Sequence, residues 1–346
     1  MLAFTICSNN YIAEALTLGD SLVRNGLSQD RFLIFICDKS NKKILYENFN
    51  YQVFAIDQLI VPNFENLLNK FEVVELNTAV KPSIFKYLAV KFPKENICYL
   101  DPDLNFYHDV KDLETELGES SILLTPHITQ PRPIAQVPAE NVFLNYGLYN
   151  LGFLLLKVNK ATADFLNWWE ERTHELGINN PSVGLFVDQL WINLVPIFFG
   201  DVKISKHLGL NVAYWNLNER FLTRESGHLK INGQPLMFFH FSSFDFDLKQ
   251  ISRRGYSKLD VSQEEIVKAL CIDYKQKLEM NGYTFYKTIG YAYKLSFDNY
   301  LKRFLPQKNI SKKELKILMF CNAIIPRRLL KYAANLYHKI TVIENY

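Results

Sequence analysis

Two aspartates that flank a proline are the residues of this chain that most suggest chemistry. Asp101 and Asp103 follow an apolar run, residues 97–100, whose composition predicts a short buried strand. In extended backbone, residues two positions apart face the same side, and Pro102 stiffens the spacer between them. Two carboxylates aimed at one point suit a divalent cation that carries a diphosphate. Asp-Pro-Asp is also an ordinary turn sequence, so the pair alone leaves a metal site and a simple turn both open.

A histidine far along the chain could complete such a site. His240 stands near the end of an apolar strand expected at residues 236–241. A histidine among phenylalanines is usually a structural residue, and that interpretation stays open. Two carboxylates and one imidazole are nevertheless a suitable ligand set for Mn²⁺, or for Mg²⁺ with diphosphate oxygens in the remaining positions.

Alternating strands and helices would position these residues. The patterns predict strands at residues 2–7, 31–37, 51–56 and 97–100, and helices at residues 11–25 and 78–92. Gly26 is expected to end the first helix, Thr78 to cap the second, and Pro82 to lie in the first turn of the second. This alternation predicts an α/β fold with a mostly parallel sheet. Ligands bind such sheets beyond the carboxyl ends of the strands, where both aspartates fall.

The remainder of the chain predicts further elements and a change of character near its end. Strands are expected at residues 121–125 and 148–158, with a proline-rich loop over the site at 126–138, and helices at 161–176, 185–195 and 261–280. We expect a catalytic domain over residues 1–255 and a C-terminal helical region over 256–346. Basic helices at 312–319 and 327–337 would cap the domain or make peripheral contact with a membrane.

Composition excludes several classes of protein. The length of 346 residues allows one large α/β domain with a smaller appendage, and the net charge of +3 is too small to imply nucleic acid as a partner. The five cysteines are scattered without a CxxC pair, which indicates reduced thiols and no zinc site. The first residues lack the basic segment of a signal peptide, and no apolar run reaches the ~20 residues of a membrane helix. We therefore expect a cytoplasmic protein, with membrane association left open.

Four motifs in order give a more specific indication. They are Tyr-Leu-Asp-Pro-Asp at 99–103, Tyr-Asn-Leu-Gly-Phe at 149–153, Asp-Gln-Leu-Trp-Ile-Asn at 188–193 and His-Phe-Ser at 240–242. Together they resemble the DxD, FNxG-like, DQxxxN and HxxG motifs of retaining GT-A glycosyltransferases of the galactosyltransferase/glycogenin type. The resemblance covers roughly residues 1–250. The segment 211–220 also resembles a bacterial subgroup of uncharacterised glycosyltransferases.

The resemblance implies a role for each matching residue. Asp101, Asp103 and His240 would hold Mn²⁺ or Mg²⁺, and Asn150 would contact the donor sugar. Beside them, the resemblance places Asp188 and Gln189 near the anomeric carbon, Lys81 near the donor diphosphate, and Ser8, Asn10 and Tyr11 around the nucleoside. The protein would be a hexosyltransferase of polysaccharide biosynthesis. It would carry a sugar from a nucleotide donor, a UDP-sugar first, to a glycan or lipid-linked saccharide acceptor, with retention.

The chain departs from the family pattern after the histidine. Ser243 stands where the family usually has glycine, and the lysine that follows in the family is missing; Lys249, Arg253 or Arg254 could substitute. Two alternatives therefore stay open: an inverting transferase with Asp188 as general base, and a glycan- or membrane-binding module without catalysis. A sugar-nucleotidyltransferase would want a glycine-rich phosphate loop after the first strand, which is absent from the sequence.

Two further sites are ambiguous in sequence. Tyr214, Trp215 and Asn216, with Arg220, would either stack on an acceptor sugar or form a core strand with a turn. His127 could face the site, but a histidine in a surface loop is the expectation.

Overall fold

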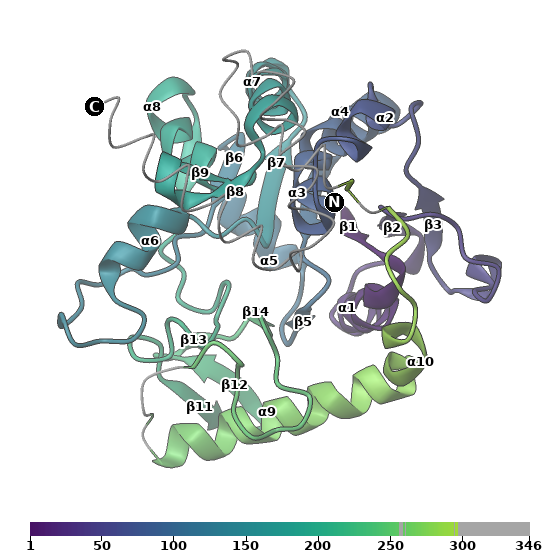
Figure 1. Ribbon diagram of the computed structural model, residues 1–346. Coiled ribbons are helices and arrows are strands. Elements are labelled where there is room, and N and C mark those ends of the chain that lie inside the picture. The colour runs from purple at the N-terminus through teal and green to yellow at the C-terminus, as the bar shows by residue number, and fades with distance from the viewer. Residues whose placement is uncertain (256–258, 260, 294, 297–346) are drawn as a thin grey trace, which may run out of the picture.

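The computed structural model describes residues 1–255, 259, 261–293 and 295–296 (Figure 1). Seven of its strands form one sheet in the order β10-β6-β7-β4-β1-β2-β3. Their bounds are β1 Leu2–Cys7, β2 Phe32–Ile36, β3 Gln52–Ala55, β4 Asn96–Leu100, β6 Ile122–Leu124, β7 Phe153–Lys157 and β10 Val202–Ile204. Only β7 runs antiparallel to its neighbours in this sheet. The predicted α/β fold with a mostly parallel sheet is confirmed.

Strand β1 is buried along its whole length because both of its faces are covered. Leu2, Phe4 and Ile6 pack into one hydrophobic cluster, whereas Ala3 and Cys7 pack into another on the opposite face. Helices α4 (Lys81–Lys91) and α7 (Lys160–Leu176) cover the first face; α1 (Ile12–Arg24) and α5 (Lys111–Leu117) cover the second. The sheet is therefore a sandwiched layer whose carboxyl edge remains free to build a site.

The helix expected at 78–92 is two helices. Helix α3 spans Val73–Ala79, and Val80 separates it from α4. Thr78 is not a cap: its hydroxyl donates to the carbonyls of Val74 and Glu75 inside α3. A capping box of Glu72 and Glu75 starts α3 instead, and Pro82 lies in the first turn of α4 as predicted. Gly26 follows the end of α1 with a φ of +96°, as a helix-ending glycine requires.

The prediction of a helix at residues 185–195 is wrong. Residues Asn179–Asn180 (β8) and Leu185–Phe186 (β9) form a small antiparallel pair, followed by a 3₁₀ segment at Leu190–Leu194 and the short helix α8 at Val195–Phe198. Val187 between them has a φ of +42°, which interrupts any helix. The strand expected at 148–158 is reduced to β7, and α6 (Glu140–Tyr146), which the pattern did not predict, follows the loop at 126–138.

A second layer lies below the sheet in the view of Figure 1. Strand β5 (Leu104–Phe106) pairs antiparallel with β14 (Phe238–His240), and β11 (Leu222–Glu225), β12 (His228–Ile231) and β13 (Gln234–Pro235) form a separate small sheet. Helix α9 spans Val261–Met280, as predicted, and α10 spans Tyr283–Lys287. The remaining helix, α2, spans Phe64–Leu68.

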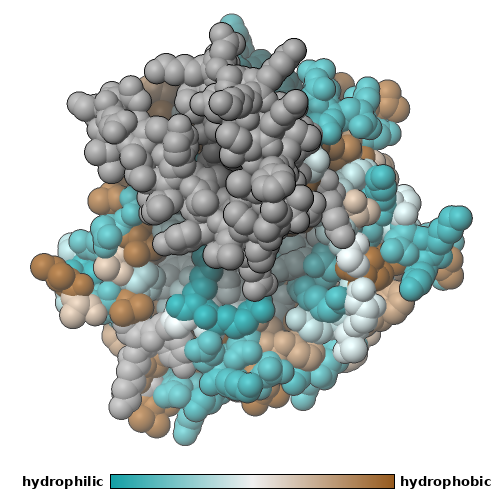
Figure 2. Space-filling model, in the orientation of Figure 1, coloured by the Kyte–Doolittle hydropathy of each residue, from teal (hydrophilic) through white to brown (hydrophobic). Residues whose placement is uncertain are grey.

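Helix α9 turns an apolar face inward against a third hydrophobic cluster. Hydrophilic side chains predominate in the lower centre of Figure 2, where α9 and the neighbouring segments lie. No helix among the described residues is long and apolar enough to cross a membrane. The domain boundary near residue 255 stays a prediction, and the basic stretches 312–319 and 327–337 lie outside the described residues.

Candidate functional site

The Asp101–Asp103 segment is a turn that joins β4 to β5. The amide of Leu104 donates to the carbonyl of Asp101 at 3.3 Å, so the extended spacer predicted from the sequence is wrong. The carboxylates still converge because the turn is anchored on both sides. The amide of Asp101 donates to the carbonyl of Gly152 at 2.7 Å, and the carbonyl of Asp103 accepts from the amide of Phe241 at 2.9 Å.

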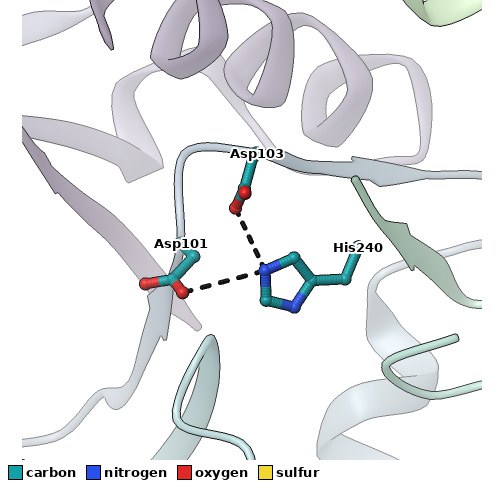
Figure 3. A group of neighbouring side chains, drawn as sticks. All are labelled: Asp101, Asp103 and His240. Carbon is teal, nitrogen blue, oxygen red and sulfur yellow. Dashed lines mark ion pairs between the residues drawn. The ribbon is translucent and has the colours of Figure 1, made fainter. Parts of the chain in front are cut away.

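The pairing of β5 with β14 brings His240 to the turn. His240 lies opposite Leu104 in the register, and its Nε2 lies 3.1 Å from Asp103 Oδ1 and 3.9 Å from Asp101 Oδ2 (Figure 3). One ligand atom from each of the three residues lies within 4.8 Å of the others, a grouping found once among the described residues. Two carboxylates and an imidazole fit Mn²⁺ or Mg²⁺ better than a softer metal.

Charge balance inside the cluster ties proton binding to metal binding. Burial lowers the pKa of His240, but the Asp103 and Asp101 carboxylates outweigh it and raise that pKa above its usual value. Burial raises the pKa of Asp103, but His240 outweighs it, so the pKa lies below its usual value. A metal bound by the two carboxylates would therefore compete with the proton that they favour on the imidazole.

Asn211 sets the orientation of the imidazole. His240 Nδ1 lies 3.0 Å from Asn211 Oδ1, so Nδ1–H donates there and Nε2 faces the carboxylates. The Asn211 amide nitrogen donates to Thr125 Oγ1 at 3.0 Å and to Asn150 Oδ1 at 2.9 Å. Asn211 is fully buried with a φ of +55°. No sequence motif points to Asn211, although asparagine adopts such backbone readily.

Asn150 belongs to the same buried network. Its Oδ1 accepts from the amide of Gly152 at 2.9 Å, and its amide nitrogen donates to His127 Nε2 at 3.1 Å. The expectation that His127 is a surface residue is wrong: it is buried, and its Nδ1 faces the carbonyl of Leu148 at 3.4 Å. Burial lowers the pKa of His127 to about 3, which keeps the ring neutral. These contacts link Asn150 to the proposed metal ligand His240 through Asn211.

Gly152 is required by this crowding. A Cβ atom on Gly152 would lie 2.6 Å from His240 Cε1, 2.8 Å from Asn150 Oδ1 and 3.0 Å from Asp101 Oδ2. The glycine of the Asn-Leu-Gly motif therefore leaves the space in which the histidine and the first aspartate meet.

Lys81 and Asp188 form a buried ion pair beside the cluster. Lys81 Nζ lies 2.8 Å from Asp188 Oδ2 and 3.8 Å from Asp101 Oδ1. It also donates to the carbonyl of Leu151 at 3.1 Å and lies 4.2 Å from the centre of the Tyr99 ring, whose hydroxyl donates to Asp101 Oδ1 at 2.5 Å. Burial raises the pKa of Asp188, and Lys81 opposes that rise.

Gln189 uses both ends of its amide on backbone. Its Oε1 accepts from the amide of Leu151 at 3.0 Å, and its Nε2 donates to the carbonyl of Tyr146 at 2.6 Å. The side chain thus joins the end of α6 to the segment that precedes β7. Asp188 is thus linked to the cluster through Lys81, whereas Gln189 holds the backbone of Leu151 and Tyr146.

The residues predicted to border the nucleoside lie at the end of β1. Ser8 Oγ donates to Asn10 Oδ1 at 2.6 Å, and Asn9 is held by Lys39 and Tyr46 through its side chain. Tyr11 is 38% exposed. Burial first, and then the charge of Asp103, raise the pKa of Tyr11 to about 12, which places the tyrosine within electrostatic reach of the carboxylate cluster.

The departure at Ser243 has a conformational side. Ser243 has a φ of +55°, the left-handed region in which glycine costs least. Of the three substitute cations, Lys249 is 82% exposed and pairs with Asp247 at 3.8 Å. Arg253 acts electrostatically on Tyr11, whereas Arg254 bonds Tyr214. The arginines therefore lie closer to the site than Lys249 does.

The aromatic segment after Asn211 is core. Tyr214, Trp215 and Asn216 are buried in a turn and form no strand, and the Trp215 ring packs edge-on to His240 at 5.2 Å. Arg220 is also buried, where it donates to the carbonyls of Leu208 and Leu210. Of the two interpretations left open, the structure favours core packing, with Trp215 supporting the imidazole.

The chain matches no family model. It is 26% identical to the uncharacterized protein YfnF of Bacillus subtilis strain 168 over 293 residues, which cover 81% of this chain and 96% of YfnF. It is 27% identical to YfnD of the same organism over 175 residues, which cover 48% of this chain and 52% of YfnD.

Two solved structures are similar over most of the chain. The galactosyltransferase LgtC, solved with donor and acceptor sugar analogues, has a TM-score of 0.48 at 13% identity and covers 80% of this chain and 95% of its own. The glycosyltransferase GlyE of Streptococcus pneumoniae TIGR4 has a TM-score of 0.41 at 15% identity and covers 85% of this chain and 65% of its own.

Proposed function

We propose that this protein is a metal-dependent glycosyltransferase. It moves a hexose from a nucleoside-diphosphate donor, a UDP-sugar first, to a glycan or lipid-linked saccharide acceptor, with retention of configuration. The observation that carries the proposal is the meeting of Asp101, Asp103 and His240 beyond the carboxyl end of β4, where ligands of such sheets bind. The order of the four motifs supports it.

The chemistry needs a group that stabilises the leaving diphosphate. Mn²⁺ or Mg²⁺ held by the three ligands would supply it as a Lewis acid. Asn211 keeps His240 Nε2 turned toward the carboxylates, and Tyr99 donates to Asp101 on the oxygen nearer Lys81. This chain therefore contributes a preorganised ligand set whose geometry is already fixed by its own hydrogen bonds.

Lys81 and Asp188 are proposed to position this set. A general base must come within hydrogen-bond reach of the acceptor hydroxyl. The Asp188 side chain is 2% exposed and has the Lys81 ammonium at 2.8 Å. Its burial supports a positioning role over that of a base, and so supports retention over the inverting alternative. We place the proposed metal ligands and the Lys81–Asp188 pair in the predicted catalytic domain of residues 1–255.

A donor-hydrolysis screen tests the proposal. UDP-, GDP- and CMP-sugars are incubated with the protein with and without Mn²⁺, beside Asp103→Ala and the control Asp112→Ala, an exposed residue of α5 that pairs with His108. Metal-dependent release of one nucleotide that is lost only in Asp103→Ala is expected. An α-linked product from an α-linked donor would establish retention, and a β-linked product the inverting alternative. No turnover and no rise in melting temperature with any donor would indicate a binding module without catalysis.

A further inference from the structure

Helix α10 places the side chain of Lys287 near the end of β1. The Lys287 ammonium lies 2.6 Å from Glu14 Oε1 and 3.7 Å from the centre of the Tyr11 ring. Glu14 belongs to the first turn of α1 and Tyr11 to the segment that links β1 to α1. Lys287 follows these residues by more than 270 positions, so the fold and not the local sequence brings it here.

The end of β1 adjoins the proposed metal ligands. Strand β1 pairs parallel with β4, so the carboxyl ends of the two strands lie at one edge of the sheet, where the segment with Tyr11 follows β1 and Asp101 follows β4. Glu14, Tyr11 and Lys287 therefore line the side of the site on which the nucleoside is expected. This is the side from which a diphosphate would reach a metal held by Asp103.

Lys81 and Lys249 are less suited than Lys287 to bind a diphosphate. Lys81 is buried and shared between Asp188, Asp101 and the carbonyl of Leu151. Lys249 is 82% exposed beside Asp247. The Lys287 side chain is 27% exposed. It combines a position next to Tyr11 with access from solvent.

The partner of Lys287 leaves room for an exchange. Glu14 is buried, and its Oε2 has no hydrogen-bond partner among the described residues. Burial raises the pKa of Glu14, so the cost of leaving this carboxylate without Lys287 is reduced when it takes up a proton. A lysine is a flexible point charge that can turn from a carboxylate to a phosphate.

We propose that Lys287 binds the diphosphate of the nucleotide donor, so that α10 completes the nucleotide site. This inference rests on the proposed function. It assigns to the region after residue 255 a direct part in binding the donor.

Calorimetric titration of the full chain with UDP, UMP and uridine in Mn²⁺ tests this assignment. Lys287→Met is compared with Lys277→Met, a matched control on α9 in which a lysine likewise pairs with one carboxylate, Asp273, and lies over one tyrosine ring, that of Tyr107. Loss of a charge-assisted contact predicts a UDP affinity about 10- to 100-fold weaker in Lys287→Met. Affinity for uridine should not change, and Lys277→Met should match the wild type.

A double variant separates binding from support of the fold. Glu14→Gln/Lys287→Met removes both charges and so leaves no unpaired buried carboxylate. If Lys287 only neutralises Glu14, this variant recovers wild-type UDP affinity and the assignment is overturned. If Lys287 binds the diphosphate, the variant stays as weak as Lys287→Met. Wild type that binds none of UDP, GDP and CDP would contradict the proposed function itself, whereas equal UDP binding by wild type and Lys287→Met would contradict only this assignment.

Discussion

The buried Lys81–Asp188 pair shows how single charges are placed beside the cluster. Both side chains are almost inaccessible, at 3% and 2% exposure, so each ion depends on the other for most of its compensation. Lys81 also has Asp101 at 3.8 Å, which makes it the link between the pair and the proposed ligands. Removal of one partner would leave an uncompensated buried charge, whereas removal of both would not.

A double-variant cycle measures this dependence. Asp188→Leu and Lys81→Met are each expected to lower the free energy of unfolding by about 3–5 kcal/mol. Lys81→Met/Asp188→Leu should lose less than the sum of the two single changes, because no unpaired ion remains. Urea denaturation gives all the values, with Lys230→Met at the exposed Lys230–Glu225 pair as a control expected to cost under ~1 kcal/mol. Strictly additive losses would show that the two charges do not depend on each other.

His127 gives the protein a pH dependence of stability. Burial holds its pKa at about 3 in the folded protein, against 6.5 for the ordinary side chain. Between pH 6.5 and 3 the unfolded chain therefore binds a proton at His127 that the folded chain does not bind. The free energy of unfolding is unaffected by this difference above pH 6.5 and decreases as the pH falls from 6.5 toward 3. The expected slope from this one group is ~1.4 kcal/mol per pH unit.

His127→Gln should flatten that slope by the same amount, because glutamine can accept the Asn150 hydrogen bond without titrating. Urea unfolding at a series of pH values between 4 and 6 checks it, and His228→Gln on the exposed face of β12 should leave the slope as in the wild type. Parallel curves for wild type and His127→Gln would mean that the ring is protonated in the folded state.

At the scale of elements, apolar runs were good predictors and junctions were poor ones. Strands β1, β2 and β4 fall where the runs predict them, because a strand buried on both faces consists mostly of apolar residues. The turn at Asp101–Asp103 is held by backbone hydrogen bonds to Gly152 and Phe241, and the carbonyl of Ala79 at the end of α3 accepts from Thr173, so both junctions involve residues far along the chain. Local pattern cannot report such contacts.

The same distinction explains the residues of the site. Asp101, Asp103 and His240 carry chemistry in their types, so motif order suggested them. No motif pointed to Asn211 or His127, because their importance lies in hydrogen bonds. Both side chains bond Asn150, and Asn211 also bonds His240. Lys287 belongs to an element that no motif connects to the site, and only the packing of α10 against the β1–α1 junction reveals it.

The residue just before β7 contacts two of the proposed metal ligands. Gly152 precedes β7, and its carbonyl accepts from the amide of Asp101. In Gly152→Ala, the new methyl group would lie 2.6 Å from His240 Cε1, so the imidazole or Asp101 must move. We expect Mn²⁺ affinity to fall about 10- to 100-fold, the range seen when ligand-supporting residues are changed.

Electron paramagnetic resonance of free Mn²⁺ measures this loss, with far-ultraviolet circular dichroism to show that the fold is kept. Gly200→Ala is the control, since a Cβ at Gly200 meets nothing within 4 Å. Unchanged Mn²⁺ affinity in a folded Gly152→Ala protein would argue that these three side chains do not form the metal site.

At the scale of the whole molecule, α9 is part of the body that carries the site. Tyr274 of α9 is 1% exposed and stacks on Phe241 with ring centres 3.8 Å apart and planes within 4°. Phe241 directly follows His240, and its amide donates to the carbonyl of Asp103. The helix after the predicted domain boundary therefore supports the strand that presents the histidine.

Tyr274→Ala tests whether this support is cooperative. Loss of a buried aromatic ring is expected to cost about 3–5 kcal/mol. Every tryptophan of the chain lies before residue 255, at positions 168, 169, 191 and 215, so tryptophan fluorescence reports on the part that holds the site. If α9 and the sheet unfold as one unit, Tyr274→Ala lowers the urea midpoint measured by tryptophan fluorescence, although Tyr274 lies after residue 255. Phe285→Ala, at 44% exposure, should move the midpoint little. A fluorescence midpoint that does not respond to Tyr274→Ala would place α9 in a separately folding unit, and would leave Phe241 and His240 held by the β5–β14 pair alone.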